Sequence, residues 1–166
     1  MRRLSLLLLV FLWIPAATQA QRPSGPIELA LDARDVARRL LHAQMRIPAA
    51  PGALTLVYPK WLPGEHGPTG PITELVGLQL SAGGRPVEWR RDDVDMYAIH
   101  VDVPSGADAV EAAFDFLSSA NPSGYTSGAS ITPHLALLAW NQVLLYPQGT
   151  RSDEVTFKPS LRLPDG

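Results

Sequence analysis

The segment from Tyr58 to Pro71, with the sequence YPKWLPGEHGPTGP, contains residue types that active sites use, because a carboxylate and an imidazole are adjacent in Glu65 and His66. Its four prolines restrict the backbone and its three glycines permit conformations that other residues resist, so we expect a loop of defined shape. The indole of Trp61 is too large to be exposed without cost, so we expect it to anchor this loop against the domain or a neighbour. Two interpretations stay open: a rigid loop that seals one end of a sandwich, and a docking or substrate-facing surface at Glu65 and His66.

The histidines of this chain do not predict a metal site. Catalytic zinc needs three protein ligands held in one geometry, yet the histidines are far apart, cysteine is absent and no H-E-x-x-H motif occurs. The four histidines are His42, His66, His100 and His134. We therefore predict no metal bound by this chain, and we interpret His100, which lies in an alternating segment, as a surface or cross-strand residue.

The remaining candidates for chemistry are an acidic cluster and two serines. Asp92, Asp93 and Asp95 carry the ligand type that calcium prefers, but their loop lacks the glycine and the distal glutamate of an EF-hand. We interpret this loop as a solvated strand connection. Ser123 and Ser127 lie outside the G-x-S-x-G pattern that exposes a nucleophilic serine, so we predict no catalytic residue in this chain.

The N-terminus has the pattern of a secretory signal peptide over residues 1–20. Two arginines precede an apolar run at 4–14, and small residues lead to an expected cleavage after Ala20. The run is shorter than the roughly 20 apolar residues that span a bilayer, so we expect no stable membrane anchor after cleavage, and an uncleaved anchor is the competing interpretation. We expect an exported protein, periplasmic or secreted, with a short disordered leader at 21–26.

The absence of cysteine means that an exported domain must be held by its hydrophobic core, and the chain is long enough for one such core. Cleavage of the signal peptide would remove two of the 14 basic residues and leave 12 against 16 acidic ones, a formal charge of −4. No basic patch recurs along the chain, which argues against a nucleic-acid partner.

Apolar and polar residues alternate along most of the chain after the leader, and this period of two is typical of half-buried strands. Turn residues such as the pair Gly83–Gly84 separate these segments, and 16 prolines with 13 glycines disfavour a helical bundle. We therefore predict an all-β, mainly antiparallel fold over residues 27–166, either a β-sandwich or a curved saddle-like sheet. The expected strands lie at 27–31, 40–47, 54–58, 76–80, 86–90, 96–103, 110–117, 135–146 and 155–163.

Several segments leave alternatives open. A helix over Arg34–Gln44 competes with a strand there, because Ala, Arg and Leu favour helices. The apolar run at 135–146 is consistent with a central strand, or with two strands broken at Asn141. Residues 118–130 form a long loop of small residues, a length typical of functional or mobile loops. Residues 161–166 close a strand without a polar tail, so we expect a β-domain that is cut off before its end.

Three stretches resemble the N-terminal region of metallopeptidase family sixty-one: PKWLPGEHGPTGPI, GLQLSAGGRPVEWRRDDVDMYAIHVDVPSG and LAWNQVLLYPQG. Members of this family are glycyl aminopeptidase-like zinc enzymes, usually exported, in which a β-rich domain precedes a thermolysin-like catalytic domain and a PDZ domain. The resemblance extends from Ile27 to Gly166. It implies that catalytic and PDZ domains of the same polypeptide are the partners of this chain, and that the full enzyme acts on peptides.

The family holds zinc on an H-E-x-x-H motif and a downstream glutamate, where the metal activates water for peptide hydrolysis. None of these residues maps onto this chain, so the resemblance implies a zinc cofactor in the missing catalytic domain and no cofactor here. Trp61, Gly64, Glu65 and His66 match the family's loop motif, and we expect them to face that catalytic domain. Glu65 is the candidate for binding a substrate amino group.

Two functions follow as hypotheses. The first is a non-catalytic N-terminal β-domain of an exported zinc-dependent aminopeptidase, inactive alone, which supports the catalytic domain and substrate access. The alternative is a free-standing exported β-sandwich that binds a protein or peptide. An exposed apolar patch for a docking catalytic domain would favour the first hypothesis, because monomers rarely expose large apolar patches.

Overall fold

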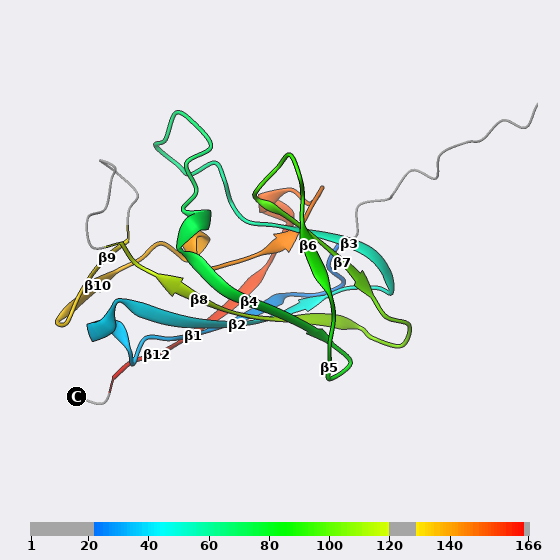
Figure 1. The fold of residues 1–166 in the computed structure, drawn as a ribbon, viewed down its shortest axis with the longest axis horizontal. Coiled ribbons are helices and arrows are strands. Elements are labelled where there is room, and N and C mark those ends of the chain that lie inside the picture. Colours follow the sequence, from blue (N-terminus) through cyan, green and yellow to red (C-terminus); the bar gives the residue numbers. More distant parts are fainter. Residues whose placement is uncertain (1–21, 120–128, 165–166) are drawn as a thin grey trace, which may run out of the picture.

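Short strands provide nearly all the regular structure in the part of the chain that the computed structural model describes, residues 22–119 and 129–164. They form a six-stranded sheet, a four-stranded sheet and a two-stranded hairpin (Figure 1). The described strands are β1 (Ile27–Asp32), β2 (Leu40–Pro48), β3 (Gly52–Val57), β4 (Leu75–Ala82), β5 (Arg85–Pro86), β6 (Trp89–Arg91), β7 (Ala98–Val103), β8 (Ala109–Leu117), β9 (Ser130–Thr132), β10 (Leu135–Leu137), β11 (Tyr146–Pro147) and β12 (Phe157–Arg162). The 3-10 helical turns are η1 (Val36–Arg38), η2 (Ile72–Glu74), η3 (Trp140–Gln142) and η4 (Ser152–Glu154).

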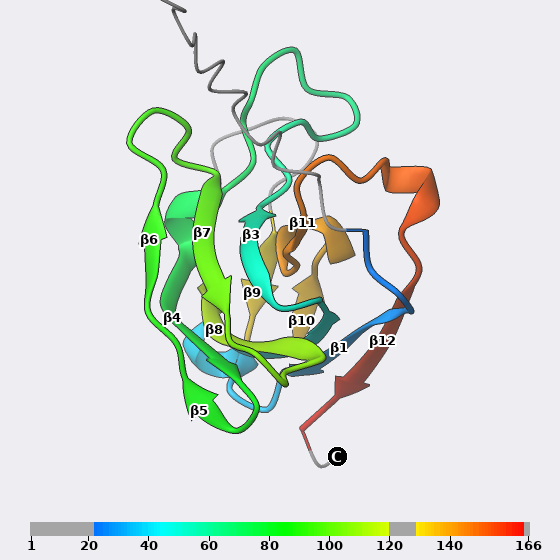
Figure 2. The same ribbon diagram turned by 90° about the vertical axis from the view of Figure 1, so that its right-hand side faces the viewer.

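The two larger sheets pack face to face as a sandwich. The six-stranded sheet has the order β12-β1-β2-β8-β4-β5, and the four-stranded sheet has the order β11-β3-β7-β6. Figure 2 shows β6, β7, β3 and β11 side by side as one layer. Buried residues of both sheets join in one hydrophobic cluster, and the strand pairs are antiparallel apart from β1 with β12. The predicted all-β, mainly antiparallel fold is therefore confirmed.

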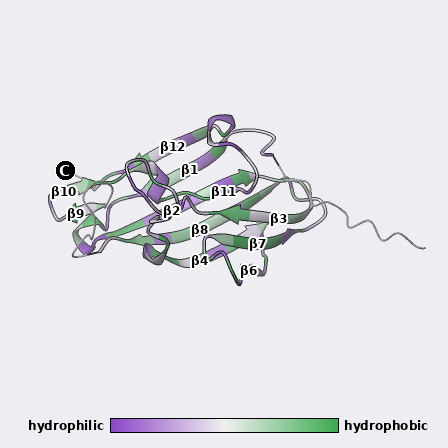
Figure 3. Ribbon diagram, turned by 90° about the horizontal axis from the view of Figure 1, so that it is seen from above, coloured by the Kyte–Doolittle hydropathy of each residue, from purple (hydrophilic) through white to green (hydrophobic). Residues whose placement is uncertain are grey.

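The alternation seen in the sequence is the alternation between core and surface. In β2, Leu41, Ala43 and Met45 are buried, while the residues between them face outward. β8 pairs with β2 along its whole length and buries Phe114 and Phe116 on the same side. Figure 3 shows the resulting hydrophobic stretches on β3, β7 and β8. β2 and β8 therefore each contribute every second side chain to one core.

The alternative helix over Arg34–Gln44 is wrong. The chain makes a single 3-10 turn, η1, which ends at Arg39 with a left-handed backbone (φ 60°), and β2 begins at the next residue. A helix would distribute Leu41 and Ala43 around its axis, whereas in β2 both are buried against β8. Burial in the core thus outweighs the helix propensity of these residues.

The prediction of a central strand over residues 135–146 is wrong, and of the alternative, two strands broken at Asn141, only the break and the first strand, β10, are confirmed. β10 pairs with β9 in a separate hairpin, η3 interrupts the chain, and β11 is an edge strand. Val143 and Leu145 are fully buried although they belong to no strand. The run is apolar because an irregular segment crosses the core, a case that periodicity cannot distinguish from a buried strand.

The expected strand at 86–90 divides between the two sheets, since β5 pairs with β4 and β6 pairs with β7. Two other predictions fall outside the described residues: the signal peptide at 1–20 and most of the loop at 118–130. Residues 22–26 precede β1 without strand or helix. Within the described ranges, no helix is both long and apolar enough to cross a membrane.

His42 lies between two carboxylates on the outer face of the six-stranded sheet, the face turned away from the four-stranded sheet. Its Nδ1 is 2.7 Å from Oδ1 of Asp115, and its Nε2 is 3.3 Å from Oδ2 of Asp35. These hydrogen bonds, first the one to Asp115, raise the pKa of His42 above its ordinary value, while burial opposes the rise. Protonated His42 therefore stabilises the fold below about pH 6.5, and this contribution is lost as the pH rises through the raised pKa.

As the pH rises from about 5.5 to 8.5, we expect the wild type to lose more free energy of unfolding than His42→Asn does, because only the wild type loses the protonated imidazole. The difference should stay below about 1 kcal/mol, because the His42 side chain is 41% exposed and solvent screens the pair. Urea unfolding at both pH values measures it, with Gln44→Asn as the control on the same face of β2. The same pH dependence in the wild type and in His42→Asn would contradict the assignment.

Candidate functional site

The Tyr58–Pro71 loop projects from the sandwich between β3 and η2 (Figure 1). Hydrogen bonds close its base. The amide of Gly70 donates to the carbonyl of Lys60 over 3.0 Å. The hydroxyl of Tyr97 lies 2.8 Å from the carbonyl oxygen of Pro68 and 3.1 Å from that of Gly70. The loop is thus tied to itself and to the segment that enters β7, and it has the defined shape expected from its prolines and glycines.

Two tyrosines anchor the loop against the domain. Tyr58 is 1% exposed, and its hydroxyl donates to the carbonyl of Gln142 over 2.8 Å. Its ring stacks with that of Tyr97, with centroids 6.4 Å apart and planes at 22°. Burial raises the pKa of the Tyr58 phenol, so the hydroxyl keeps its proton and remains a donor. These rings take the anchoring role against the domain that the sequence suggests for Trp61.

Trp61 is instead 63% exposed. Its backbone forms an isolated bridge with Pro68 across the loop, so its position is set although its side chain is not buried. The residue lines a cavity of about 510 Å³ together with Lys60, Asp95 and residues of the 141–157 segment. A large indole is therefore presented to the outside at the mouth of a cavity.

One wall of this cavity carries an ion pair. Nζ of Lys60 lies 2.6 Å from Oδ2 of Asp95 and 5.9 Å from the centre of the Tyr97 ring. The hydrogen bond from Lys60 lowers the pKa of Asp95, although burial acts in the opposite direction. Asp95 is therefore a carboxylate that holds the base of the loop to the connection between β6 and β7.

Two other residues of the cavity lining, Asn141 and Thr150, each carry a buried polar atom. Oδ1 of Asn141 and Oγ1 of Thr150 are buried, and neither has a hydrogen-bond partner within the described residues. Leaving a buried polar atom unpaired costs on the order of 1–3 kcal/mol, and an ordered water is the usual partner of such an atom. Asn141 is noticeable in the sequence only as part of a polar pair inside an apolar run.

Glu65 does not line the cavity beside Trp61. It lines a second cavity of about 590 Å³ with Glu74 and Met96. Burial raises the pKa of Glu74, and the hydrogen bond from the Ser119 amide opposes the rise. Two carboxyl groups thus face a cavity that the indole does not line, so the structure does not join Trp61 and Glu65 in one site.

The other two residues of the motif have different positions. Gly64 has a positive φ of 87° in the turn where the amide of Glu65 donates to the carbonyl of Leu62. A side chain at position 64 would be strained in that conformation, which explains the glycine. His66 is exposed and lines neither cavity. The motif therefore places an indole, a turn glycine, a carboxylate and an imidazole around one loop rather than in one catalytic cluster.

The acidic cluster after β6 is a strand connection, as interpreted from the sequence. Oδ1 of Asp92 accepts from the amides of Val94 and Asp95, and Oδ2 lies 2.8 Å from Nε2 of His100. These bonds hold the pKa of Asp92 well below its usual range. His100 also contacts Thr55 across the β3–β7 pair, so it is a cross-strand residue. In the ranges 22–119 and 129–164, no three His, Asp or Glu side chains converge as a metal site would require.

Comparisons with known proteins give a family match and similar solved structures. The profile of the Peptidase M61 N-terminal domain matches residues 28–166. No curated protein matches the chain.

Two solved structures are similar to this chain. An aminopeptidase N family protein from Idiomarina loihiensis superposes with a TM-score of 0.66 at 14% identity, covering 83% of this chain and 22% of that one. A mutant M1 zinc metallopeptidase from Deinococcus radiodurans, bound to a Tyr-Ser-Ala substrate, gives a TM-score of 0.47 at 11% identity, covering 87% of this chain and 32% of that one. The first similarity shows a shared fold. This chain spans less than a third of the length of either protein.

Proposed function

Because this chain belongs to the family of peptidase M61 N-terminal domains, we propose that it is the non-catalytic N-terminal β-domain of an exported, zinc-dependent aminopeptidase. Its role is to support the catalytic domain of the same polypeptide and to shape the access of peptides to it. The family match supports the peptidase context, and the fold shared with an aminopeptidase N family protein is consistent with it. The Tyr58–Pro71 loop is the surface through which the domain contacts its neighbour.

The observation that carries this proposal is the exposed indole of Trp61 on a loop that is pinned at its base. Burying a large apolar side chain contributes about 1.5–3 kcal/mol, which Trp61 does not recover within the sandwich at 63% exposure. The contacts of Gly70 and Tyr97 hold the base of the loop in place, so the indole stands on a positioned backbone. A covering surface recovers that free energy, and the same surface can close the cavity beside Trp61.

Other exposed apolar side chains also favour a domain that is covered by a neighbour. Leu135 and Leu137 on β10 are 62% and 64% exposed, and Leu161 on β12 is 50% exposed. β12 is the edge strand of the six-stranded sheet, so one side of its backbone is free to pair. Both features suit contact with a further part of the polypeptide.

In this proposal the zinc ion is bound by the catalytic domain of the same polypeptide. The described residues do not fit a zinc site, because three suitable side chains do not come together anywhere among them. We therefore place the metal and its activated water in the catalytic domain of the same polypeptide. The contribution of this chain is to position that domain and the peptide, and Glu65 is the residue here whose carboxylate suits a substrate amino group.

The test uses the full-length polypeptide purified from the exported fraction, whose first residue should be Gln21. In Trp61→Ala we expect kcat/KM for a peptide with a free N-terminus to fall about tenfold, because loss of an apolar anchor at an interface costs 1–2 kcal/mol or more. Calorimetry should also show the sandwich unfolding separately from the rest of the polypeptide. Val76→Ala is the matched control, because Val76 is 37% exposed on β4 of the six-stranded sheet, away from the loop. It should leave kcat/KM and the unfolding of the sandwich unchanged.

Two results would overturn different parts of the proposal. Unchanged unfolding and unchanged kcat/KM in Trp61→Ala would exclude docking through the loop. A full-length wild type that binds no zinc, or that releases no N-terminal residues from peptides, would exclude the aminopeptidase itself.

A further inference from the structure

A trough crosses the outer face of the six-stranded sheet. Its floor is a row of residues, one from each of five neighbouring strands, and the row is perpendicular to the strands. The floor is low because small side chains occupy most of it, and two hollows of about 620 and 600 Å³ share its central part. Strand register places the floor residues in the order Ser160, Ala30, Gln44, Ala113, Gln79, from β12 to β4.

One wall of the trough is a row of longer side chains held by ion pairs. Arg46 is central to this row, with Nη1 2.8 Å from Oε1 of Glu111 and Nη2 3.0 Å from both carboxylate oxygens of Asp108. Glu28 pairs in register with Arg46 on the neighbouring strand. These contacts fix the wall before any ligand arrives.

The other wall has the same construction. Register places Asp32 next to His42 and His42 next to Asp115. His42 hydrogen-bonds Asp115 at 2.7 Å, and Asp32 pairs with Arg34 at 2.6 Å. Positive and negative groups alternate on both walls, but carboxylates outnumber cations, since Arg46 alone faces Glu28, Glu111 and Asp108. An excess of carboxylates disfavours an anionic ligand.

The floor provides polar groups that the protein does not use. The amides of Gln44 and Gln79 are exposed and have no hydrogen-bond partner in the described part of the chain. Oε2 of Glu111 is buried at the wall, also without a partner among those residues. Each amide can donate and accept at once, as a hydroxyl-bearing ligand requires. The two exposed glutamine amides thus face the trough, whereas the buried Glu111 oxygen is out of reach of a ligand.

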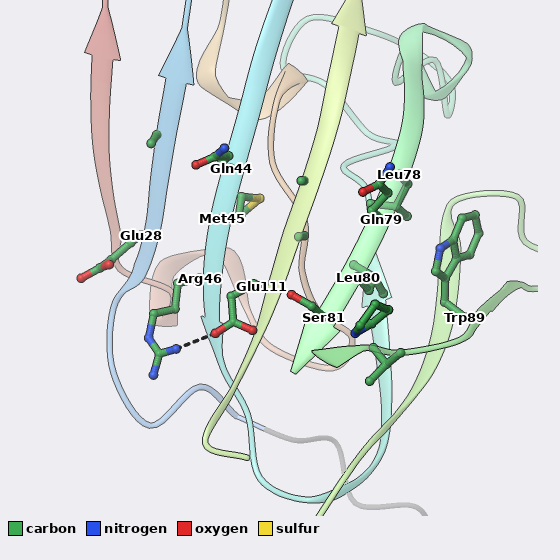
Figure 4. Close-up of a pocket in the computed structure, with 15 residues that line it drawn as sticks. Glu28, Gln44, Met45, Arg46, Leu78, Gln79, Leu80, Ser81, Trp89 and Glu111 are labelled. Atoms are coloured by element: carbon green, nitrogen blue, oxygen red, sulfur yellow. Dashed lines mark hydrogen bonds and ion pairs between the residues drawn. The ribbon is translucent and has the colours of Figure 1, made fainter. Parts of the chain in front are cut away.

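An apolar rim closes one end of the trough. Figure 4 shows the lining in order from Glu28 across Gln44 and Glu111 to Gln79, with Trp89 beyond it. Leu78, Val87 and Trp89 form this rim, and each also packs against the core, so the indole is fixed in place. The trough therefore runs from a polar floor to an aromatic end.

We propose that this trough binds a neutral oligosaccharide chain laid across the strands. Sugar hydroxyls match the free amides of the floor, and the apolar face of a sugar ring matches the fixed indole of Trp89. Neighbouring strands are about 4.8 Å apart, close to the length of one hexose unit in an extended chain, so successive units meet successive strands. This site is separate from the Tyr58–Pro71 loop and does not depend on how that loop acts.

A peptide is the less suitable ligand for this face. Extended peptides are bound most directly by adding a strand to a sheet edge, where backbone groups are free. In the trough the backbone groups of β1, β2, β8 and β4 are already paired within the sheet. The floor therefore offers side-chain groups only, which suits hydroxyls better than a peptide backbone.

The test is calorimetric titration of the full-length protein with cellotetraose and chitotetraose as neutral probes. We expect at least one to bind with a Kd on the order of 0.1–1 mM. The double variant Gln44→Ala with Gln79→Ala should weaken binding about tenfold or more, and Ala113→Gln should abolish it by filling the floor. All three positions are exposed, so these variants should keep the unfolding midpoint of the wild type. Gln148→Ala, an exposed glutamine outside the trough, is the matched control and should bind as the wild type does.

Three outcomes would overturn the inference. The first is that neither tetrasaccharide binds the wild type with a Kd below about 10 mM, because weaker binding than this does not indicate a specific site. The second is that the floor variants bind as tightly as the wild type. The third is that an uncharged acetylated Ala-Ser tetrapeptide binds in the trough while both saccharides fail, which would make the ligand a peptide.

Discussion

Replacing Gly70 with alanine should destabilise the domain by roughly 2–4 kcal/mol and open the base of the Tyr58–Pro71 loop. A Cβ atom at position 70 would lie 2.0 Å from the carbonyl oxygen of Pro59 and 2.9 Å from Cα of Lys60. Both are backbone atoms, so no side-chain rotation relieves the overlap. The two ends of the loop must separate, which breaks the hydrogen bond from the Gly70 amide to the Lys60 carbonyl.

The midpoint of urea unfolding, compared at equal m value, measures this loss. Gly67→Ala is the matched control within the same loop, because a Cβ there meets only a Thr69 methyl group at 3.9 Å. We expect that variant to stay within about 0.5 kcal/mol of the wild type. If both glycine variants were equally stable, the loop would not be closed as described. In the full-length protein, Gly70→Ala should also reproduce the loss of activity expected for Trp61→Ala, since it displaces the same indole.

Replacing Phe116 with alanine should destabilise the domain by about 3–5 kcal/mol. Phe116 is fully buried on β8, where its neighbours in register are Leu41 on β2 and Leu75 on β4. It therefore lies at the centre of the six-stranded sheet on the side that faces the other layer. Truncation removes the ring from this contact and leaves a cavity that three paired strands cannot readily close.

The next residue supplies the control for this prediction. Leu117 is 48% exposed on the opposite face of the same strand, and Leu117→Ala should cost less than about 1 kcal/mol. Thermal or urea unfolding of the two variants measures the difference. Similar losses at both positions would mean that β8 does not have one buried and one exposed face, and the sandwich assignment would then be wrong.

The positions of strands along the chain were predictable wherever one face of the strand is buried and the other is exposed to solvent. β1, β2 and β8 were expected close to their observed positions because their apolar residues recur with a period of two. The 135–146 run was not resolved, because Val143 and Leu145 are buried in an irregular segment and carry no period. The split of the 86–90 segment between two sheets also depends on where the chain turns, which local alternation does not report.

The candidate site, too, was predictable from the sequence only in part. The quoted motif identified the Tyr58–Pro71 loop, since prolines and glycines at that density restrict the backbone whatever surrounds it. It did not identify Tyr97, Asp95 or Asn141, which reach the loop only through pairing between distant strands. It also suggested a common site for Trp61 and Glu65, which line different cavities.

By itself, the sequence determined the features that depend on neighbouring residues: the all-β class, the stiff loop, the lack of a zinc motif and the family. Those features follow from periodicity, from backbone restriction and from short motifs, all of which are local. The tertiary structure alone decided which residues meet, as when the hydroxyl of Tyr58 reaches a carbonyl 84 residues away. It also decided that Gln44, Ala113 and Gln79 form one floor, because a strand register shifted by one residue would turn each of them to the opposite face.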